Sequence, residues 1–509
     1  STGRRSCQMS AVRRLRLPLT KIVATIGPAS EELPTLLRVI DAGMRLMRLN
    51  FSHATEDEVE LRLKNLKLCP TAAPNQLGGG CAVLLDTQGP EIRTGGLRVV
   101  REQNNRRAKV TIEKGADVVL STDPALADDG DAARIFVTYG KITESVGVGS
   151  KVLLDDGAII LDVKAISGGE VHCVADNTGE LGARKGVNLP GSVVDLPAMA
   201  PKDRKDLAYG LGHDMDYVAA SFVRTAEGVR EIRDYAAEVV REKFGPEHPI
   251  PLIISKIESQ EALDNWDEIL DESDAIMVAR GDLGVEVPLQ TVAIWQKKIV
   301  ADCNAAGKPV IVATQMLESM QKNPRATRAE VADVTNALID GTDCLMLSGE
   351  SANGQYPVEA VDFMRSICDE TERFVAEEGM GAEAAAALSL EPDDRLDATA
   401  RGAVLASRAA SAAAILCASP DGELARALSR FRPDVPVVVA CADAKTARQL
   451  QIYRALHPVV LDAAAANPLA SLLATCAEAG VTLPGDDVVL VSEEAWSGHS
   501  AALTTRIVE

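Results

Sequence analysis

The segment Pro251-Leu-Ile-Ile-Ser-Lys-Ile-Glu258 begins as a continuous apolar run and ends in a pair of charged residues. Such a run is typical of a strand that is buried on both faces, as in a parallel sheet covered by helices. Because side chains alternate along a strand, Lys256 and Glu258 point to the same side. A cation and a carboxylate in this position form either a buried structural salt bridge or part of a functional site. The segment alone leaves both interpretations open.

The same order of an apolar run, a polar or glycine-rich end and a helix-like stretch recurs along the chain. The segments are Lys21–Gly27, Arg45–Ser52, Cys81–Thr87, Asp216–Phe222, Pro251–Glu258, Ala275–Leu283, Pro309–Met316 and Cys344–Glu350. Eight strand-and-helix units are the number that closes a TIM (β/α)8 barrel, an α/β fold whose sites lie at the carboxyl ends of the strands. An open doubly wound sheet is the alternative, because it uses the same units.

Three further regions differ in texture from the barrel, which we assign to residues 19–87 and 198–367. Residues 88–197 alternate strictly and carry Asp-Gly and Gly-Gly turns, so we predict an inserted small β-barrel domain that acts as a lid. Residues 368–509 are predicted to form a C-terminal α/β regulatory domain. Its expected strands are Ala414–Ser419, Pro436–Cys441, Pro458–Asp462 and Asp487–Ser492. Residues 1–18 form a basic N-terminal arm.

The composition limits what the chain can bind and where it works. A net charge of −21 argues against a nucleic-acid partner, and no apolar run is long enough to cross a membrane. The 10 cysteines contain no Cys-x-x-Cys pair, which indicates reduced thiols and not a zinc or disulfide framework. We expect a cytoplasmic protein. The alternative is a plastid or mitochondrion, if the arginine-rich N-terminus is the remnant of a transit peptide.

Polar residues follow the second and third apolar runs. In the second segment Arg48, Asn50 and Ser52 share one face, where a guanidinium beside neutral oxygen atoms can hold a phosphoryl group or line a cation site. In the third, Asp86 ends the run and Arg93 lies just past a turn. Turn chemistry for Asp86 and a surface position for Arg93 explain this segment equally well.

Two carboxylates and a hydroxyl complete the set of strand-end residues. Glu258 and Asp282 are expected on neighbouring strands, and two carboxylates with substrate oxygens and water suit Mg²⁺ better than Zn²⁺. The glycines around Asp282 permit close approach of a ligand to the backbone. Thr314 ends the seventh segment at the same mouth, although a strand-end cap is an ordinary role for a threonine.

These motifs resemble those of the pyruvate kinase family, in the same order from about residue 20 to 365. They are Thr20-Lys-Ile-Val-Ala-Thr-Ile-Gly-Pro-Ala-Ser30, Arg48-Leu-Asn-Phe-Ser-His53, Leu85-Asp-Thr-Gln-Gly-Pro-Glu-Ile-Arg-Thr-Gly95, Ile254-Ser-Lys-Ile-Glu-Ser259, Met277-Val-Ala-Arg-Gly-Asp-Leu-Gly284, Ala313-Thr-Gln-Met-Leu-Glu-Ser319 and Met346-Leu-Ser-Gly-Glu-Ser351. The resemblance implies transfer of the phosphoryl group of phosphoenolpyruvate to ADP, which gives pyruvate and ATP in the last step of glycolysis.

The resemblance also implies a role for each matching residue. Lys256, Arg48, Arg93 and Thr314 are the implied catalytic residues, with Lys256 at the transferring phosphoryl and Thr314 helping to deliver a proton. Glu258 and Asp282 are implied ligands of Mg²⁺ or Mn²⁺, and Asn50, Ser52, Asp86 and Thr87 of K⁺. The backbone amides of Gly281 and Asp282 are implied to bind the substrate carboxylate. Pro28, Arg48, His53 and Lys185 match nucleotide-side positions, and ADP or ATP is the implied partner.

Family members are allosteric homotetramers, so both properties are expected. Gln88, Asn353 and Gln355 depart from the family pattern, but none of them is an implied ligand. Glu91 stands where the family carries Glu in potassium-dependent members. Two other functions remain open: a different Mg²⁺-dependent phosphoenolpyruvate or pyruvate barrel enzyme, such as a lyase or mutase, and a non-catalytic relative.

The sequence also carries an expectation about regulation. The segment Ala418-Ser-Pro-Asp-Gly-Glu-Leu424 matches the loop on which sugar-phosphate-activated family members bind their effector. Asp421 and Glu423 repel a phosphate, and Pro420 removes one amide donor. We therefore expect fructose 1,6-bisphosphate to be a poor activator through this loop, although Trp496, Gly498 and Ser500 could form part of an effector loop.

Overall fold

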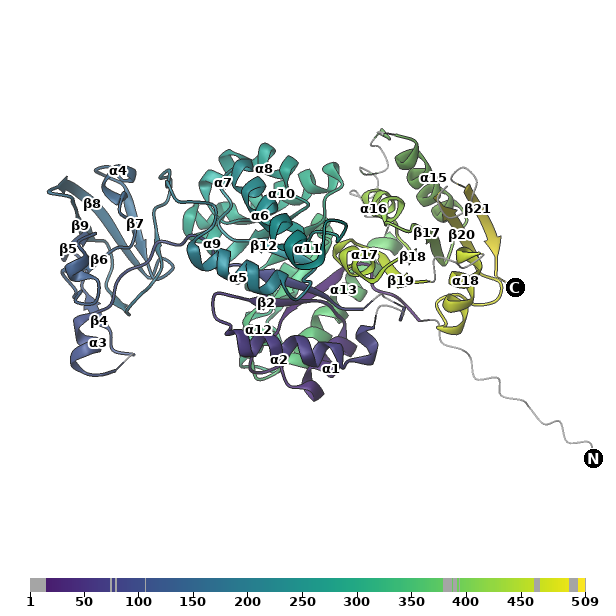
Figure 1. The fold of residues 1–509 in the computed structure, drawn as a ribbon, viewed down its shortest axis with the longest axis horizontal. Helices are drawn as coiled ribbons and strands as arrows, with labels where there is room; N and C mark the ends of the chain where they lie inside the picture. Colours follow the sequence, from purple (N-terminus) through teal and green to yellow (C-terminus); the bar gives the residue numbers. More distant parts are fainter. Residues whose placement is uncertain are drawn as a thin grey trace, which may run out of the picture.

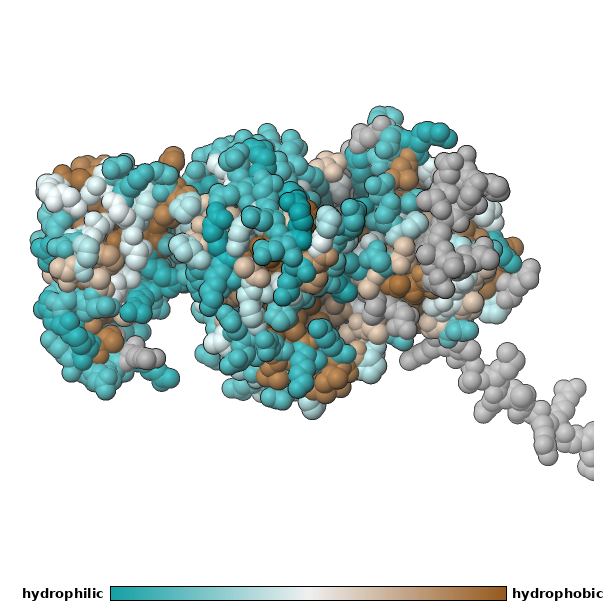
Figure 2. All heavy atoms as spheres, in the orientation of Figure 1, coloured by the Kyte–Doolittle hydropathy of each residue, from teal (hydrophilic) through white to brown (hydrophobic). Residues whose placement is uncertain are grey.

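A computed structural model describes residues 15–73, 76–77, 80–105, 107–378, 387, 391–392, 394–461, 467–493 and 502–508. Three bodies follow one another along its longest axis, with a barrel between a β domain and an α/β domain (Figure 1). The visible face of the barrel is largely hydrophilic (Figure 2). No helix among the described residues has the length and hydropathy that a membrane crossing requires.

The central body is a closed barrel of eight parallel strands, as the sequence predicted, and not an open sheet. Its strands are β1 Lys21–Thr25, β2 Met44–Asn50, β3 Ala82–Asp86, β12 Tyr217–Ala220, β13 Leu252–Ile257, β14 Ala275–Ala279, β15 Val310–Ala313 and β16 Cys344–Leu347. β1 pairs with both β2 and β16, which closes the ring. Because all strands run the same way, their carboxyl ends meet at one mouth.

Helices surround this barrel and bury its outer face. They are α1 Leu33–Ala42, α2 Glu56–Lys67, α5 Pro201–Leu211, α6 Ala226–Phe244, α7 Gln260–Asp264, α8 Trp266–Glu272, α9 Arg280–Glu286, α10 Val292–Ala306, α11 Arg328–Asp340, α12 Gly349–Ala352 and α13 Pro357–Glu378. Side chains at the amino end cap two of these helices: Thr55 and Glu58 form a capping box on α2, and Thr327 and Glu330 form another on α11.

One boundary at the mouth differs from the sequence interpretation. We expected the sixth segment to run as a strand toward Leu283, but β14 ends at Ala279 and α9 begins at Arg280. Asp282 therefore stands in the first turn of a helix and not on a strand. The run Arg280-Gly-Asp-Leu-Gly284 contains no β-branched residue, which is consistent with its helical conformation.

The inserted region forms a separate curled sheet of order β11-β7-β8-β9-β5-β6, beside a two-stranded ladder of β10 and β4. Its elements are α3 Arg98–Glu102, β4 Val110–Ile112, β5 Asp117–Ser121, β6 Arg134–Phe136, α4 Ile142–Ser145, β7 Lys151–Leu154, β8 Ile159–Ser167, β9 Glu170–Ala175, β10 Gly179–Leu181 and β11 Val187–Asn188. Isolated bridges join Arg93 to Gly186 and Thr94 to Val137. These bridges connect the two edges of the sheet, so it curls toward a small barrel.

The C-terminal body is an α/β sheet of order β19-β18-β17-β20-β21. Its elements are α15 Arg395–Ala409, β17 Ala414–Ala418, α16 Glu423–Arg430, β18 Val437–Cys441, α17 Ala444–Gln449, β19 Leu456–Val460, α18 Pro468–Glu478, β20 Asp487–Ser492 and β21 Ala502–Ile507. The edge strand β21 is antiparallel to β20 and was not predicted. A hydrophobic cluster runs from the barrel interior, including Tyr217 and Met346, into this body, including Phe431. The C-terminal body thus packs on the amino end of the barrel.

Candidate active site

Lys256 lies at the centre of the mouth, near the end of β13, and is buried. Its ammonium nitrogen is 2.7 Å from Ser221 Oγ, 3.2 Å from Asp86 Oδ1 and 2.9 Å from Glu258 Oε1. Burial lowers the pKa of Lys256, but Asp86 and Glu258 outweigh it, and the pKa is raised overall. The side chain therefore remains a fixed positive charge at neutral pH.

Arg48 and Asp86 form a further buried ion pair at the mouth. Arg48 Nε donates to Asp86 Oδ2 at 2.6 Å, and its Nη1 donates to Thr25 Oγ1 at 2.8 Å. Burial raises the pKa of Asp86, yet Arg48 and Lys256 outweigh that effect and hold the pKa below its usual range. Two cations thus share this one carboxylate, and their positive charge holds it ionised.

Glu258 and Asp282 form a pair of acidic residues beside Lys256. Glu258 is fully buried, and burial raises its pKa to about 7. Burial also raises the pKa of Asp282, and the charge of Asp282 adds to the rise in the pKa of Glu258. Two buried carboxyl groups that lie close together cannot easily both carry a negative charge. A bound cation removes this repulsion, so such a pair is typical of a cation site.

The residues present fit a divalent cation. Within the part of the chain that the structure describes, Glu258 Oε1 accepts no hydrogen bond. It lies 2.9 Å from Lys256 Nζ, which is an ion-pair distance, but the direction of that contact is poor for a hydrogen bond. No group of three or more His, Cys, Asp or Glu side chains suited to a metal occurs among those residues. Two carboxylates without a complete protein cage suit Mg²⁺, which keeps water and substrate oxygens as its other ligands.

The residues implied as potassium ligands come together at the ends of β2 and β3. Asn50 pairs with Asp86 in the strand register, and Ser52 and Thr87 follow them in the chain. Asn50 Oδ1 accepts from the Ser52 amide at 3.0 Å. Carboxylate, amide and hydroxyl oxygens of this kind are hard donors, which fits a monovalent cation better than any soft metal.

Thr314 is held in a strained conformation at the end of β15. Its φ is +70°, which is a clear outlier for a β-branched residue, and such strain clusters at functional sites. Thr314 Oγ1 accepts from the Gly281 amide at 2.8 Å, and Arg280 donates to its carbonyl oxygen at 2.6 Å. The start of α9 therefore fixes the Thr314 hydroxyl, and the Gly281 amide is already used. As N3 of a helix, Asp282 has an amide without an intrahelical acceptor.

A cavity of about 360 Å³ lies between the barrel and the inserted β domain. His53, Arg93, Lys185 and Asp282 all line it. Arg93 Nε donates to Glu91 at 2.6 Å, and Lys185 pairs with Asp155 at 2.9 Å. Arg93 and Lys185 thus line the same space as Asp282, and this space is large enough for a ligand.

Of the implied nucleotide-side residues, Arg48 and Pro28 do not line this cavity. Arg48 belongs to the buried ion pair with Asp86, whereas Pro28 follows β1 and is exposed to solvent. The structure therefore brings His53 and Lys185 to the cavity and Arg48 to the buried charges of the mouth, but it places Pro28 in neither.

Two residues of the mouth were missed from the sequence. Ser221 and Phe222 follow β12, where Ser221 contacts Lys256 and the Phe222 amide donates to Glu258 Oε2 at 2.6 Å. Phe222 has a φ of +54°, which is unusual for a bulky residue. A lone serine carries no charge to draw attention, and the only signal was its place at the end of a predicted strand.

Comparisons with known proteins agree along almost the whole chain. The pyruvate kinase barrel domain model matches residues 17–361, and the pyruvate kinase alpha/beta domain model matches residues 397–508. The human protein pyruvate kinase PKLR is 45% identical over 427 residues, which cover 82% of this chain and 71% of that protein. Pyruvate kinase of Dictyostelium discoideum is 42% identical over 439 residues, which cover 84% and 83%. A crystal structure of a pyruvate kinase from Cryptosporidium parvum superposes with a TM-score of 0.87 at 34% identity, covering 97% of this chain and 96% of that one.

Proposed function

The chain belongs to the pyruvate kinase family, and from this premise we propose which of its residues perform the reaction. The function is that of a phosphotransferase, in which the phosphoryl group of phosphoenolpyruvate passes to ADP and gives pyruvate and ATP. The observation that carries the proposal is the buried cluster of Lys256, Arg48 and Asp86 beside the acidic pair of Glu258 and Asp282.

Lys256 and Arg48 stabilise the phosphoryl group in transit. Phosphoryl transfer through a loose transition state needs charge placed around the phosphoryl oxygens and little covalent chemistry from the protein. Both side chains are held in place before substrate arrives, Arg48 by Asp86 and Thr25 and Lys256 by Asp86. Arg93 faces the same cavity from the base of the inserted domain and contributes to binding phosphate.

Glu258 and Asp282 hold a divalent ion, Mg²⁺ or Mn²⁺. Held there, the ion would supply Lewis-acid stabilisation of negative charge on the substrate. Its support in this chain is the unbonded Glu258 Oε1 and the raised pKa of both carboxyls, for which burial is the largest cause. Asn50, Ser52, Asp86 and Thr87 hold a K⁺ ion, supported by their register at adjacent strand ends.

The remaining roles concern the substrate carbon skeleton and the nucleotide. The Asp282 amide receives the substrate carboxylate together with the Gly281 amide, which must first exchange its bond to Thr314 Oγ1. Thr314 helps to deliver the proton that turns enolpyruvate into pyruvate. The fixed Thr314 hydroxyl supports this role. ADP occupies the cavity near His53 and Lys185, with Pro28 at its outer side, and residues 88–197 act as a lid over it.

A homotetramer is the proposed assembly, and regulation through the C-terminal body is the proposed control. The support is an exposed strand edge at β21, where Leu503 and Ile507 are exposed, together with Leu405 of the neighbouring α15. Unpaired strand edges with apolar side chains favour pairing with another chain. The cytoplasm is the proposed compartment, with a plastid or mitochondrion as the alternative.

A coupled assay tests the function directly. Purified protein is given phosphoenolpyruvate and ADP, and pyruvate and ATP are measured with and without Mg²⁺ and K⁺. We expect ADP-dependent pyruvate formation that requires both ions, because Glu91 matches the potassium-dependent members of the family. Na⁺ and ammonium are excluded from the potassium-free arm, so that it contains no other monovalent cation of this kind. Consumption of phosphoenolpyruvate without ADP would instead favour a lyase or mutase, and no turnover under any condition would favour a non-catalytic relative.

A further inference from the structure

Ser221 is the contact of Lys256 that the proposed mechanism does not use. It follows β12 and is 3% exposed, and its hydroxyl oxygen lies 2.7 Å from Lys256 Nζ. Among the described residues this is the shortest polar contact of Lys256 and the only one to a neutral group, since Asp86 is at 3.2 Å and Glu258 at 2.9 Å. The question is what a neutral acceptor supplies that the two carboxylates do not.

The Ser221 hydroxyl has one proton, and its neighbours decide where that proton goes. The carbonyl oxygen of Thr87 lies 2.7 Å from Ser221 Oγ, whereas Asp86 Oδ1 lies at 3.3 Å. The proton therefore goes to the Thr87 carbonyl, and a lone pair faces the Lys256 ammonium. The Ser221 amide also donates to Thr87 Oγ1 at 3.1 Å, so the residue is bound to the end of β3 by backbone and side chain.

The two carboxylates that contact Lys256 have other duties. Asp86 is shared with Arg48, and Glu258 is a proposed ligand of the divalent ion. Ser221 contacts the ammonium without neutralising its charge, and it is not among the residues proposed to hold the divalent ion. Its next residue, Phe222, donates its amide to Glu258 Oε2, so one short turn braces both charged groups.

We propose that Ser221 is a positioning residue for Lys256, which holds the ammonium at the phosphoryl group and acts on the rate only through that lysine. The proposal rests on the proposed role of Lys256 in phosphoryl transfer. A hydrogen bond to a charged group in a buried site is among the stronger ones in proteins. We therefore expect Ser221→Ala to lower kcat about 10- to 100-fold, with a KM for phosphoenolpyruvate within about threefold of the parent.

Ser255 provides a matched control. It is as buried as Ser221 and precedes Lys256 in the same strand, but its side chain points to the opposite face and contacts Ser273 Oγ at 2.6 Å. Ser255→Ala removes the same atom from an equally buried site without touching Lys256. We expect its kcat to stay near that of the parent. Thermal unfolding of both variants checks that each is folded.

A double-mutant cycle separates positioning from a merely structural role. Ser221→Ala is measured in the parent and in a Lys256→Met background. If Ser221 acts through Lys256, the substitution slows the parent but changes kcat by less than about twofold in the Lys256→Met background. An equal loss in both backgrounds, or a folded Ser221→Ala with unchanged kcat, would overturn the proposal. A parent without turnover would instead contradict the proposed function.

The potassium site offers one competing explanation, because Ser221 also binds the Thr87 carbonyl. A loss that acted through this ion would raise the K⁺ concentration needed for half-maximal activity. It would also persist in the Lys256→Met background. We expect the K⁺ dependence of Ser221→Ala to match that of the parent and of Ser255→Ala, and a strong shift confined to Ser221→Ala would overturn the assignment to Lys256.

Discussion

The two ends of the barrel both bury charged side chains, yet only one of them is built as a site. At the carboxyl end, Glu258 Oε1 has no hydrogen-bond donor among the described residues, and a cavity of about 360 Å³ lies beside Asp282. At the amino end, Asp216 is fully buried but accepts from Arg448 at 2.8 Å and from the Val83 amide at 2.8 Å.

The ion pairs of the amino end join the barrel to the C-terminal body. Lys445 and Arg448 of α17 bind Asp214 and Asp216, and Arg432 binds Asp343 at 2.6 Å. These charges are matched with one another across an interface. The difference teaches that burial of charge does not identify a site. An incomplete ligand set and open space beside the charge do.

The largest expected effect comes from a substitution that disrupts the charged cluster at the carboxyl end of the barrel alone. We expect Lys256→Met to fold but to lose about 10²–10³ in rate or more, because the substitution keeps the apolar stem and removes the preorganised charge. Steady-state kinetics with phosphoenolpyruvate and ADP, together with thermal unfolding, measure both quantities. Near-normal turnover by the folded variant would show that this cluster is as structural as the one at the amino end.

The reciprocal substitution breaks the amino end. We expect Asp216→Asn to lower the free energy of unfolding by about 3 kcal/mol, because among the described residues it leaves the buried Lys445 and the half-buried Arg448 with Asp214 as their one remaining carboxylate partner. Its kcat at low temperature should stay within a few-fold of the parent. Denaturant titration and kinetics check the two halves of this expectation. A large loss of kcat in a variant of parental stability would contradict the contrast between the two ends.

The sequence predicted the parts of this contrast that depend on local pattern. The eight apolar runs became the barrel strands, and their polar ends met at one mouth because parallel strands share a direction. Local pattern could not show Ser221, whose meaning comes from contacts with Thr87 and Lys256 of other strands. It also missed β21, because Ala502–Ile507 mixes threonine and arginine with its apolar residues at a sheet edge. The pairing of Asp216 with Arg448 spans two bodies, so no motif announced it.

Lys21 sharpens the comparison, because it is the least satisfied charge of the amino end. It is fully buried and donates to the Leu456 carbonyl oxygen, and burial, with Arg45, lowers its pKa to about 7. Between pH 7 and its ordinary value of 10.5, the unfolded chain carries a proton that the folded chain lacks. The stability contributed by this residue therefore rises with pH through that window, and the full cost of burying the charge is present below pH 7.

A methionine at this position removes that cost. We expect Lys21→Met to raise the free energy of unfolding by about 1–2 kcal/mol below pH 7, after the loss of the bond to Leu456 is included. The gain should shrink as the pH approaches 10.5, because the parent then unfolds to a neutral lysine as well. Denaturant titrations of both proteins from pH 6 to 10 measure it. A gain that stayed constant from pH 6 to 10 would show that Lys21 is charged in the folded chain throughout.

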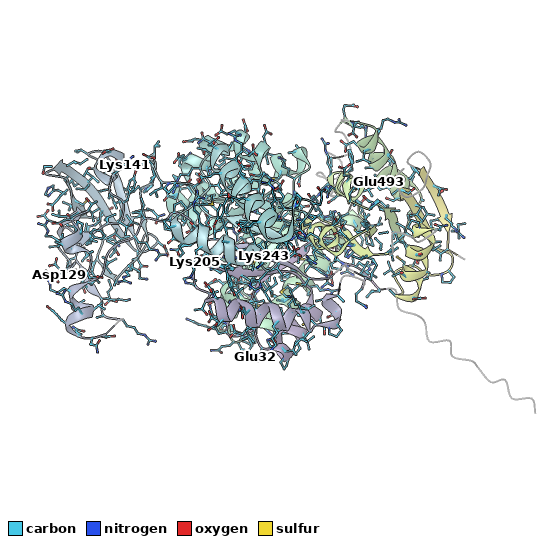
Figure 3. The ribbon with its side chains drawn as sticks, in the orientation of Figure 1. Glu32, Asp129, Lys141, Lys205, Lys243 and Glu493 are labelled. Carbon is cyan, nitrogen blue, oxygen red and sulfur yellow. The ribbon has the colours of Figure 1, made fainter. Side chains whose placement is uncertain are left out.

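The smallest expected effect concerns the C-terminal body, where the protein supplies its own anion. Glu493 lies after β20 in this body (Figure 3). Its carboxylate accepts from the Ser419 hydroxyl and from the Leu424 amide, the latter at 2.9 Å. Asp421 also accepts from the Glu423 amide at 3.0 Å. The donors at the start of α16 that could bind a phosphate are thus used by side chains of the same body.

We therefore expect fructose 1,6-bisphosphate to leave the phosphoenolpyruvate saturation curve almost unchanged. A phosphate at this loop must displace Glu493 and approach Asp421 and Glu423, and each carboxylate repels it. Trp496, Gly498 and Ser500 lie outside the described residues, so the expectation rests on the loop from Ser419 to Leu424 alone. Titration of the bisphosphate at subsaturating phosphoenolpyruvate measures the shift, with Glu493→Gln as the variant that removes the internal charge. A strong leftward shift in the parent that disappears in Ser419→Ala would show that the loop binds the effector despite its own carboxylates.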